Sequence, residues 1–381
     1  MARATDLDDF HIQTASHPSA IAVPVALAVA ELRGQVSGKE LITGVVAGSE
    51  VMCRMRLVPD FCSAVSGWSS EVYGGFGAAV TAGKIMGLTP EEMRYALGLA
   101  YSQAAGVVQP FYDGTLATSL QPGFAARSGV LAALLARRGI TGARNFLEGR
   151  AGFYPVYYRG IKYDVGRLID GIGEKYEVLN VATKLYPCCG YTHAAIENVL
   201  DIMQRNRVSA EDVSKVLLRV NQRTYSFVCT PQQNKYRPQT VVDAMFSLPY
   251  VVGVAMVRGD VFLEDFTPEA VGDTGRLKGV DGVEVMLDEN VERESKELNL
   301  PLSLHIADLT TKSGECFSQK MLHVKGYPQK PITMDDCAEK VKKCALFAIK
   351  PFPEDKVNQL IEIVEKLEQQ KDVSYLAKLL S

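Results

Sequence analysis

Apolar side chains recur every three or four positions through the first half of the chain, which predicts one helix after another. Ser37 and Glu40 fit a capping box, in which the serine accepts a backbone hydrogen bond and the glutamate reaches back, so a helix is expected to begin directly after the serine. Thr89 and Glu92 repeat this spacing, with proline at the first helical position. The pattern therefore predicts two capped helices.

Two stretches of this half are unusually rich in small residues. Residues 74–83 are mostly glycine and alanine, which suits close packing of helices, and no strand followed by GxGxxG marks a dinucleotide loop there. The small residues at 123–138 indicate a second helix of this kind, which ends before Gly139. We expect this helix to be buried nearly all round.

The pattern changes near residue 180, where short runs of β-branched and other apolar residues predict strands. The predicted strands are residues 216–220, 283–287, 304–311 and 316–324, and helices return after residue 335 and over 356–370. The fold class is therefore mainly α with α+β: a large all-helical domain and a smaller inserted α+β lid domain. The expected boundaries are 1–180 for the helical domain, 181–325 for the lid, and 326–381 for a helical return that packs on the first domain.

Composition narrows the class of protein. The chain has 381 residues, of which 47% are hydrophobic and 22% charged, as in ordinary folded proteins. A net charge of −3 lacks the basic excess that nucleic acid requires. The longest apolar run, residues 20–30, is shorter than the ~20 residues of a membrane span. An acidic amino-terminal stretch and eight scattered cysteines without a CxxC pair favour a cytoplasmic protein with reduced thiols and no metal site.

Five histidines limit the search for a group that transfers protons at neutral pH. His11 and His17 lie in residues 5–20 together with three aspartates, and carboxylates beside an imidazole can fix its tautomer and raise its pKa. The alternative is a polar loop that caps the following helix. His305 and His323 lie in a predicted hairpin and are expected to be structural or exposed.

A second cluster, residues 184–193, precedes a predicted helix at 194–203. It holds a lysine, two adjacent cysteines and a histidine, and the amide groups at the start of the helix could assist an anion. Adjacent cysteines do not easily face one metal ion, and a cysteine nucleophile would need a lowered pKa. The spacing therefore indicates a candidate anion pocket.

Five segments together resemble the MmgE/PrpD family over nearly the whole chain. They are the region of His17-Pro18-Ser19, residues 67–90, residues 120–127, residues 184–193, and residues 237–250. The family includes 2-methylcitrate dehydratase, cis-aconitate decarboxylase and iminodisuccinate epimerase. The resemblance implies a helical domain joined to an α+β lid, activity without metal or organic cofactor, and a homodimer.

The resemblance also implies residue roles. In the helical half of the site, His17 would transfer a proton and Asp6 would orient it. In the lid half, Lys184 would hold a substrate carboxylate and Tyr250 would protonate a departing hydroxyl, with His193 among the substrate-binding residues. A hydrogen next to a carboxylate is weakly acidic, so such a site needs a base near the carbon and cations near the oxygens.

The chain departs from the family pattern at three positions that would face the substrate. Ser69 stands where many members have a histidine, Thr118 where some have a lysine, and Cys189 where the decarboxylase has a histidine. The sequence also begins almost at the motif that contains Asp6, whereas relatives carry several helices before it. Either the chain is a short form or its start is truncated.

The expected activity is that of a lyase of the dehydratase type, acting next to a carboxylate of a small di- or tricarboxylic acid. An epimerase or a decarboxylase of the same fold is the alternative within the enzymes. A catalytically inactive relative that binds a metabolite is the alternative outside them, because the positions of Ser69 and Thr118 have lost their usual groups.

Overall fold

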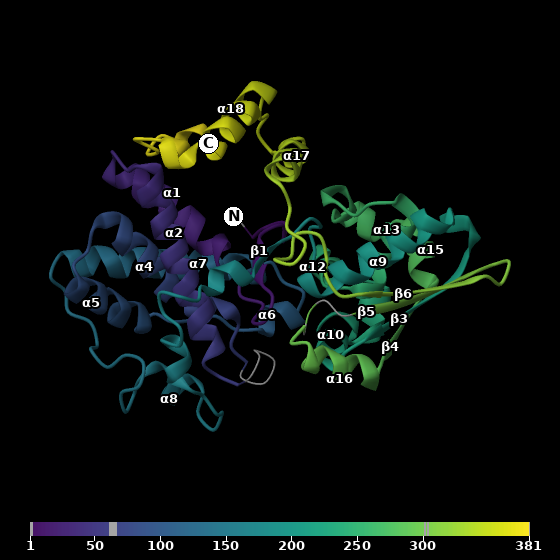
Figure 1. Cartoon of the computed structure of the whole chain (residues 1–381), viewed down its shortest axis with the longest axis horizontal. Helices are drawn as coiled ribbons and strands as arrows, with labels where there is room; N and C mark the ends of the chain where they lie inside the picture. Colours follow the sequence, from purple (N-terminus) through teal and green to yellow (C-terminus); the bar gives the residue numbers. More distant parts are fainter. Residues whose placement is uncertain (1–2, 61–66, 301, 303–304, 381) are drawn as a thin grey trace.

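The computed structural model describes residues 3–60, 67–300, 302 and 305–380. Figure 1 shows two groups of elements side by side along the longest axis: helices of the first half of the chain, and a sheet with its covering helices from the second half. The buried apolar residues form two clusters that largely follow this division. The protein is therefore mainly helical with a small sheet, as the sequence predicts.

The first group consists of helices and includes the two with predicted capping boxes. Its members are α1 (Ser19–Arg33), α2 (Gly38–Leu57), α4 (Gly74–Met86), α5 (Pro90–Tyr101), α6 (Gln109–Tyr112), α7 (Ala117–Arg137) and α8 (Phe153–Tyr157). Ser37 Oγ accepts a hydrogen bond from the Glu40 amide at 3.2 Å, and Thr89 Oγ1 accepts one from the Glu92 amide at 3.3 Å. Both glutamate side chains reach back to the capping residue. The two predicted capping boxes and helix starts are confirmed.

Small residues let α2, α4 and α7 approach one another closely. A Cβ atom on Gly48 of α2 would overlap Thr81 of α4, and one on Gly129 of α7 would overlap Ala78 of α4. A larger side chain at either glycine would push the helices apart. The run at 74–83 therefore forms a helix-packing surface, as predicted.

Helix α7 is not buried on all sides, so the expectation for residues 123–138 was wrong in this respect. Its small residues, such as Ala125 and Gly129, face α4, whereas Leu120, Phe124 and Leu131 are 51%, 55% and 44% exposed. The small side chains gather on one face and the large ones on the other. The helix therefore leaves an apolar stripe uncovered within the described chain.

The second group is built on a four-stranded sheet of order β4-β3-β5-β6. The strands are β3 (Val213–Val220), β4 (Val283–Leu287), β5 (His305–Thr311) and β6 (Cys316–Met321). β3 runs parallel to β4 and antiparallel to β5, and β5 and β6 form a hairpin. The sequence predicts all four strands, although β6 ends at Met321 and Leu304 lies outside the described residues.

Helices cover this sheet and fill its connections. The helix α9 (Gly190–Asn206) contacts β5 and β6, and α13 (Leu248–Arg258) contacts α9 and α15 (Thr274–Asp281). The shorter helices are α10 (Gln222–Thr224), α11 (Gln232–Tyr236), α12 (Val241–Met245), α14 (Pro268–Val271) and α16 (Glu289–Glu297). The predicted helix at 194–203 is α9, which begins four residues earlier.

A short two-stranded ladder joins the amino-terminal segment to the start of the second group. β1 (Asp9–His11) pairs antiparallel with β2 (Val181–Thr183), and Asp9 lies opposite Thr183. Because Asp8 precedes one strand and Lys184 follows the other, the ladder brings these two side chains together. The sequence pattern predicts neither strand, since each has only three residues.

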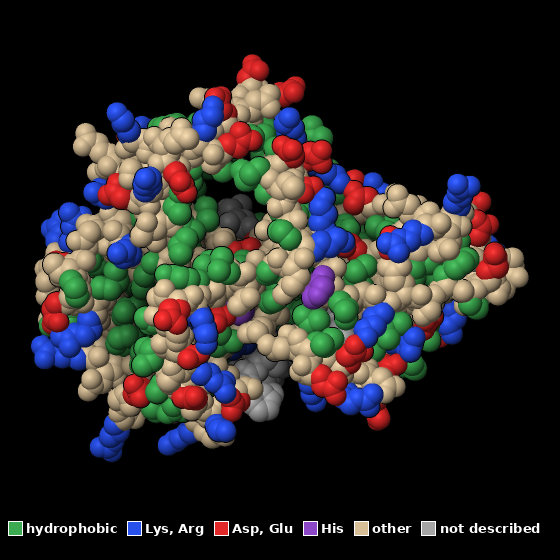
Figure 2. Space-filling model, viewed as in Figure 1, with side chains coloured by type: hydrophobic (Ala, Val, Ile, Leu, Met, Phe, Trp, Pro, Cys, Tyr) green, Lys and Arg blue, Asp and Glu red, His purple; other side chains and the backbone are tan. Residues whose placement is uncertain are grey.

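The carboxyl-terminal helices return to the first group. They are α17 (Met334–Ala345), α18 (Glu354–Glu365) and α19 (Leu376–Leu379), drawn in yellow in Figure 1. The amide of Val373 donates to the backbone oxygen of Val36 at 2.7 Å. Figure 2 shows a hollow beneath α18, and apolar side chains of α1, α2, α17 and α18 line a cavity there.

Candidate active site

A pocket lies where the amino-terminal segment, the first helices and the start of α9 meet. It is lined by Arg3, Asp6, Phe10, Ala15, His17, Ser69, Ser70, Glu71, Val107, Val108, Phe111, Thr118, Gln121, Lys184, Cys189, Gly190, Tyr191, Arg223, Phe227, Phe246 and Leu302. Six of the eight residues singled out from the sequence are among them. The structure thus brings together six predicted side chains from Asp6 to Cys189, 183 positions apart along the chain.

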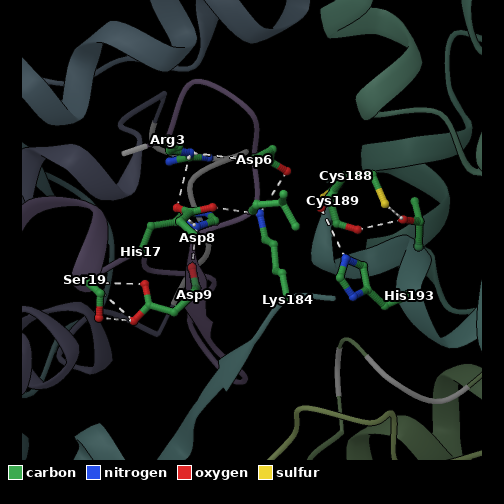
Figure 3. Close-up of polar contacts among 12 residues, drawn as sticks. Arg3, Asp6, Asp8, Asp9, His17, Ser19, Lys184, Cys188, Cys189 and His193 are labelled. Atoms are coloured by element: carbon green, nitrogen blue, oxygen red, sulfur yellow. Dashed lines mark hydrogen bonds and ion pairs between the residues drawn. The ribbon is translucent and has the colours of Figure 1, made fainter. Parts of the chain in front are cut away.

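The Asp8 carboxylate is the centre of the polar contacts in Figure 3. His17 Nδ1 lies 2.9 Å from Asp8 Oδ2, and Lys184 Nζ lies 3.1 Å from Asp8 Oδ1. Burial opposes ionisation, but Lys184, His17 and Arg3 together hold the pKa of Asp8 well below its usual range. Asp8 is therefore a buried anion that orients both the imidazole and the ammonium group.

The expected role of Asp6 as the partner of His17 is not the role that the structure gives it. Asp6 adopts a positive φ of 51°, and its Oδ2 lies 2.9 Å from Lys184 Nζ. This left-handed conformation turns the side chain towards the lysine, while the second aspartate of the motif, Asp8, faces His17. Asp6 therefore positions the lysine, and Asp8 takes the orienting role.

The tautomer of His17 follows from its hydrogen bonds. Nδ1 also lies 2.8 Å from the backbone oxygen of Asp9, which can only accept. Nδ1 therefore carries a hydrogen, and Nε2 is the basic nitrogen. Among the residues described, no hydrogen bond to His17 Nε2 is formed, and the side chain is 12% exposed at the pocket. The imidazole is thus arranged to accept a proton from a bound molecule.

The helix-capping interpretation of the same segment also holds, for a different aspartate. Asp9 Oδ1 accepts a hydrogen bond from the Ser19 amide at 3.1 Å, at the start of α1. Burial raises the pKa of Asp9 to about 6, and its hydrogen bonds from Ser19 oppose this rise. The three aspartates of the motif therefore divide into two that contact Lys184 and one that caps a helix.

Lys184 is fully buried between Asp6 and Asp8. Burial alone would lower the pKa of its ammonium group, but the two carboxylates raise it above the usual value. Its backbone oxygen accepts a hydrogen bond at 2.7 Å from Lys340 of α17, so a helix of the carboxyl-terminal return supports the strand exit. Lys184 is a permanent cation at the pocket wall.

Arg3 and Glu71 form an ion pair at the same wall, and the sequence analysis missed both. The Arg3 side chain is 10% exposed, and its Nε lies 3.7 Å from Asp6 and 3.9 Å from Asp8. Burial opposes the charge on Glu71, whereas Arg3 and then His17 lower its pKa. Glu71 is therefore an anion that holds the arginine, and it stands two positions after Ser69.

Ser69 and Thr118 line the pocket as expected, but they bring hydroxyl groups where relatives were expected to carry a histidine and a lysine. Thr118 Oγ1 is buried and has no hydrogen-bond partner among the described residues. A hydroxyl can donate to or accept from a substrate oxygen but cannot act as a base at neutral pH. The chemistry at this side of the pocket is therefore limited to binding.

Cys189 lines the pocket, whereas His193 lies behind it. Burial raises the pKa of Cys189 to about 11, so its thiol is protonated at neutral pH and is a poor nucleophile. His193 is buried between Phe10 and Tyr186, and burial, then Lys184, lowers its pKa to about 3. His193 is thus neutral, and the structure gives it no contact with the pocket that would support substrate binding.

Tyr250 also lies away from the pocket, so the expected role as an acid for a departing hydroxyl has no geometric support. It is buried in α13, and its hydroxyl donates to the backbone oxygen of Asp265 at 2.8 Å. Burial raises the pKa of the phenol, which makes it a weaker acid. Tyr250 stabilises the fold of the second group.

The other two buried histidines lie outside the pocket, and neither a metal site nor a membrane-spanning helix is found in the described residues. His305 is fully buried in β5, where burial lowers its pKa to about 4, and His11 Nε2 lies 3.3 Å from Glu177. Over the described ranges, no group of three or more metal-binding side chains is found. In the same part of the chain, no helix combines the length and the apolar character that a membrane crossing needs.

Two family models together match most of the chain. The MmgE/PrpD N-terminal domain matches residues 1–165, and the MmgE/PrpD C-terminal domain matches residues 186–369. The chain belongs to the MmgE/PrpD family. The expected family resemblance is confirmed.

Relatives of this MmgE/PrpD protein are decarboxylases and a decarboxylase-like protein. The cis-aconitate decarboxylase-like protein oryM of Aspergillus oryzae is 28% identical, and the match covers 100% of this chain and 80% of the relative. Cis-aconitate decarboxylase of Aspergillus terreus is 26% identical over 100% and 79% of the two chains. Human cis-aconitate decarboxylase is 28% identical over 98% and 76%. Family membership and these relatives support an enzyme of the lyase type.

Several charged residues in the pocket of this MmgE/PrpD protein, or directly behind its wall, had no usable signal in the sequence. Asp8 stands in a run of three aspartates, and spacing cannot tell which of them faces His17. Arg3, Glu71 and Arg223 are single charged residues with no motif around them. The ladder between β1 and β2, the short helical turn Ser70–Tyr73 and α10 bring them to one place.

Proposed function

We propose that this chain is a lyase that acts next to a carboxylate of a small di- or tricarboxylic acid, with elimination of water as the favoured reaction. One observation carries the proposal: His17 and Lys184 share the carboxylate of Asp8 at the wall of a partly enclosed pocket. A basic nitrogen and a fixed cation in one place are what removal of a proton next to a carboxylate requires.

The reaction follows from the charges. Lys184 and Arg3 lie where the oxygens of a substrate carboxylate would gain charge as the neighbouring C–H bond breaks. His17 Nε2 takes the proton, and Asp8 stabilises the imidazolium that forms. The electron pair of the C–H bond forms the alkene as the C–O bond to the hydroxyl breaks. Because Tyr250 is remote, we assign the return of the proton to the departing hydroxyl, as water, to His17.

Decarboxylation is the second candidate, because the relatives named above are cis-aconitate decarboxylases or like them. In that reaction His17 first takes a proton from water and enters as the imidazolium. The C–C bond to a carboxylate then breaks, carbon dioxide leaves, and the carbon that keeps the electron pair receives the proton from His17. The hydroxyl groups of Ser69 and Thr118 would then hold the carboxylate that remains. Activity without metal or organic cofactor, and a cytoplasmic location, are parts of the same proposal.

The test is a proton NMR screen in deuterated water with hydroxylated and unsaturated di- and tricarboxylates. A dehydratase yields a new alkene signal, a decarboxylase yields a product one carbon shorter, and an epimerase exchanges the hydrogen without an alkene. His17→Ala should lower kcat by about 10²–10⁴-fold. His323→Ala, a half-buried histidine outside the pocket, is the control. A folded His17→Ala protein with unchanged kcat, or the absence of an alkene or decarboxylated product with every acid tested, would overturn the proposal.

A further inference from the structure

Three long cationic side chains line the pocket, and they differ in their partners. Arg3 pairs with Glu71 and lies near Asp6, and Lys184 is held by Asp6 and Asp8. Arg223 lies between this pocket and the neighbouring cavity that Asp60 and Arg167 line, and no ion pair to it is formed within the described residues. The charge of Arg223 is therefore the one that the described protein leaves uncompensated at this pocket.

The guanidinium of Arg223 is nevertheless held in place. It belongs to α10, directly after the end of β3, so the sheet fixes its backbone. Its Nη1 donates to the backbone oxygen of Gln13 at 3.2 Å, and its carbon lies 5.7 Å from the centre of the Tyr191 ring. Its Nε is buried and has no hydrogen-bond partner within the described ranges. An oriented donor without a partner is costly unless a ligand supplies the acceptor.

Aromatic rings extend from Arg223 along the wall. Tyr191 and Phe227 stack with ring centres 5.3 Å apart, and Phe227 stacks on Phe111 at 5.0 Å. Phe246 meets Phe111 edge to face at 4.8 Å. All four rings line the pocket. This wall offers apolar contact to the carbon skeleton of a ligand and no charge to a second hydroxyl or acid group.

We propose that Arg223 binds a second carboxylate of the substrate, so that the ligand is an acid with two carboxylates joined by an apolar, branched or unsaturated segment that lies on the aromatic wall. This proposal rests on the function proposed above, which places the first carboxylate of the substrate at Lys184 and Arg3. An arginine suits this task because its planar fork matches the two oxygens of a carboxylate. Arg223 is then a specificity-determining residue rather than part of the proton transfer.

The test is a calorimetric binding measurement on the full chain with matched acids. Mesaconate and citraconate are branched unsaturated dicarboxylates, and tiglate and angelate carry a methyl group in place of the second carboxylate. Tiglate matches mesaconate in double-bond geometry, and angelate matches citraconate. For whichever dicarboxylate binds more tightly, the wild-type chain should bind it at least about 10-fold more tightly than the matching monocarboxylate, as expected for one charge-assisted contact. Arg223→Met should weaken the dicarboxylate by a similar factor and leave the monocarboxylate within about 3-fold.

Two further variants separate direct contact from other effects. Arg223→Lys keeps the charge and should retain part of the preference, which also guards against a folding defect in Arg223→Met. Arg167→Met is the matched control, because Arg167 lies in a neighbouring cavity, pairs with Asp60 at 2.8 Å and does not line the pocket. Equal wild-type affinity for the two acids, or equal weakening of both by Arg223→Met, would overturn the proposal.

Measurement of turnover beside binding shows whether the Arg223 proposal or the lyase proposal has failed. If the NMR screen finds no reaction but the dicarboxylate preference depends on Arg223, the lyase proposal fails and the Arg223 proposal stands. If a dicarboxylate is turned over and Arg223→Met leaves its KM unchanged, the lyase proposal stands and the Arg223 proposal fails.

Discussion

His17 and Lys184 contact opposite oxygens of one carboxylate, that of Asp8. The residue that would move the proton and the residue that would hold the substrate are therefore not independent. A proton gained by His17 adds a positive charge next to the anion that also stabilises Lys184. Substitution of the aspartate should affect both.

Asp8→Asn should lower kcat by about 10²-fold on the identified substrate, because the amide keeps the shape but cannot stabilise the imidazolium. The backbone oxygen of Asp9 still fixes the tautomer of His17, so a residual rate is expected. Steady-state kinetics measures this. Asp9→Asn is the matched control: the amide oxygen can still accept from the Ser19 amide at the start of α1, so stability and kcat should both stay close to those of the wild type. Equal losses of kcat in both variants would contradict the division of roles.

Lys184→Met should destabilise the protein by about 3 kcal/mol, because it leaves the buried carboxylates of Asp6 and Asp8 with fewer cations. Adding Asp6→Asn should recover about 1 kcal/mol or more, since asparagine tolerates the positive φ and removes one of the charges. Urea unfolding of the two single variants and the double variant gives this coupling. If the changes in unfolding free energy of the single variants add up to that of the double variant, Lys184 does not stabilise the Asp6 carboxylate. In whatever fraction folds, Lys184→Met should raise KM.

Short sequence patterns and the family resemblance predicted different parts of the structure. The capping boxes at Ser37 and Thr89 and the four strands of the sheet could be predicted because each depends on a few neighbouring residues. The pocket position of His17, Lys184, Ser69, Thr118 and Cys189 came from the family resemblance, since no local pattern joins them. The exposure of one face of α7 could not be predicted, because a small-residue helix looks buried from composition alone.

The errors in the site have a common physical cause. Asp6 and Asp8 are two positions apart, and the positive φ of Asp6 together with the β1–β2 ladder decides which one faces His17. Tyr250 lies in the expected segment, but its hydroxyl is taken by the backbone oxygen of Asp265. In each case a backbone conformation or a backbone partner decides where the side chain points, and a single sequence does not display either.

The stability of the protein should fall as the pH is lowered from 6.5, in part because of His193. Burial lowers the pKa of this histidine from 6.5 to about 3, so between these values the unfolded chain binds more protons than the folded one. The stability contributed by the neutral imidazole is present above pH 6.5 and is lost as the pH falls towards 3. The slope from one such group is at most about 1.4 kcal/mol per pH unit.

His193→Gln should therefore show a shallower loss of unfolding free energy between pH 6.5 and 5 than the wild-type protein, by up to about one proton. Urea unfolding at several pH values measures the difference, and comparison of slopes removes the contribution of other groups. Parallel curves for wild type and His193→Gln would contradict the prediction.

The uncovered face of α7 bears on the homodimer that the family resemblance implies. Leu116, just before the helix, and Leu120, Phe124 and Leu131 within it recur at spacings of four, four and seven, so they lie on one side, and all are at least 44% exposed. A contiguous apolar stripe of this kind is typical of a surface that another molecule covers. We expect a second copy of the chain to cover it, with a symmetric interface in which the same face meets itself.

Leu120→Glu combined with Phe124→Glu should convert the dimer to a monomer at micromolar concentration, because it would place four carboxylates in an apolar symmetric interface. Light scattering should give about 83 kDa for wild type, twice the 41.6 kDa of one chain, and about 42 kDa for the variant. Thermal unfolding at low concentration should change little, since both side chains are exposed in one chain. Ile349→Glu is the matched control, because it changes a more exposed apolar residue outside α7 and should leave the dimer intact. A monomeric wild-type protein would contradict the dimer, and a dimeric double variant would show that the interface lies on another face.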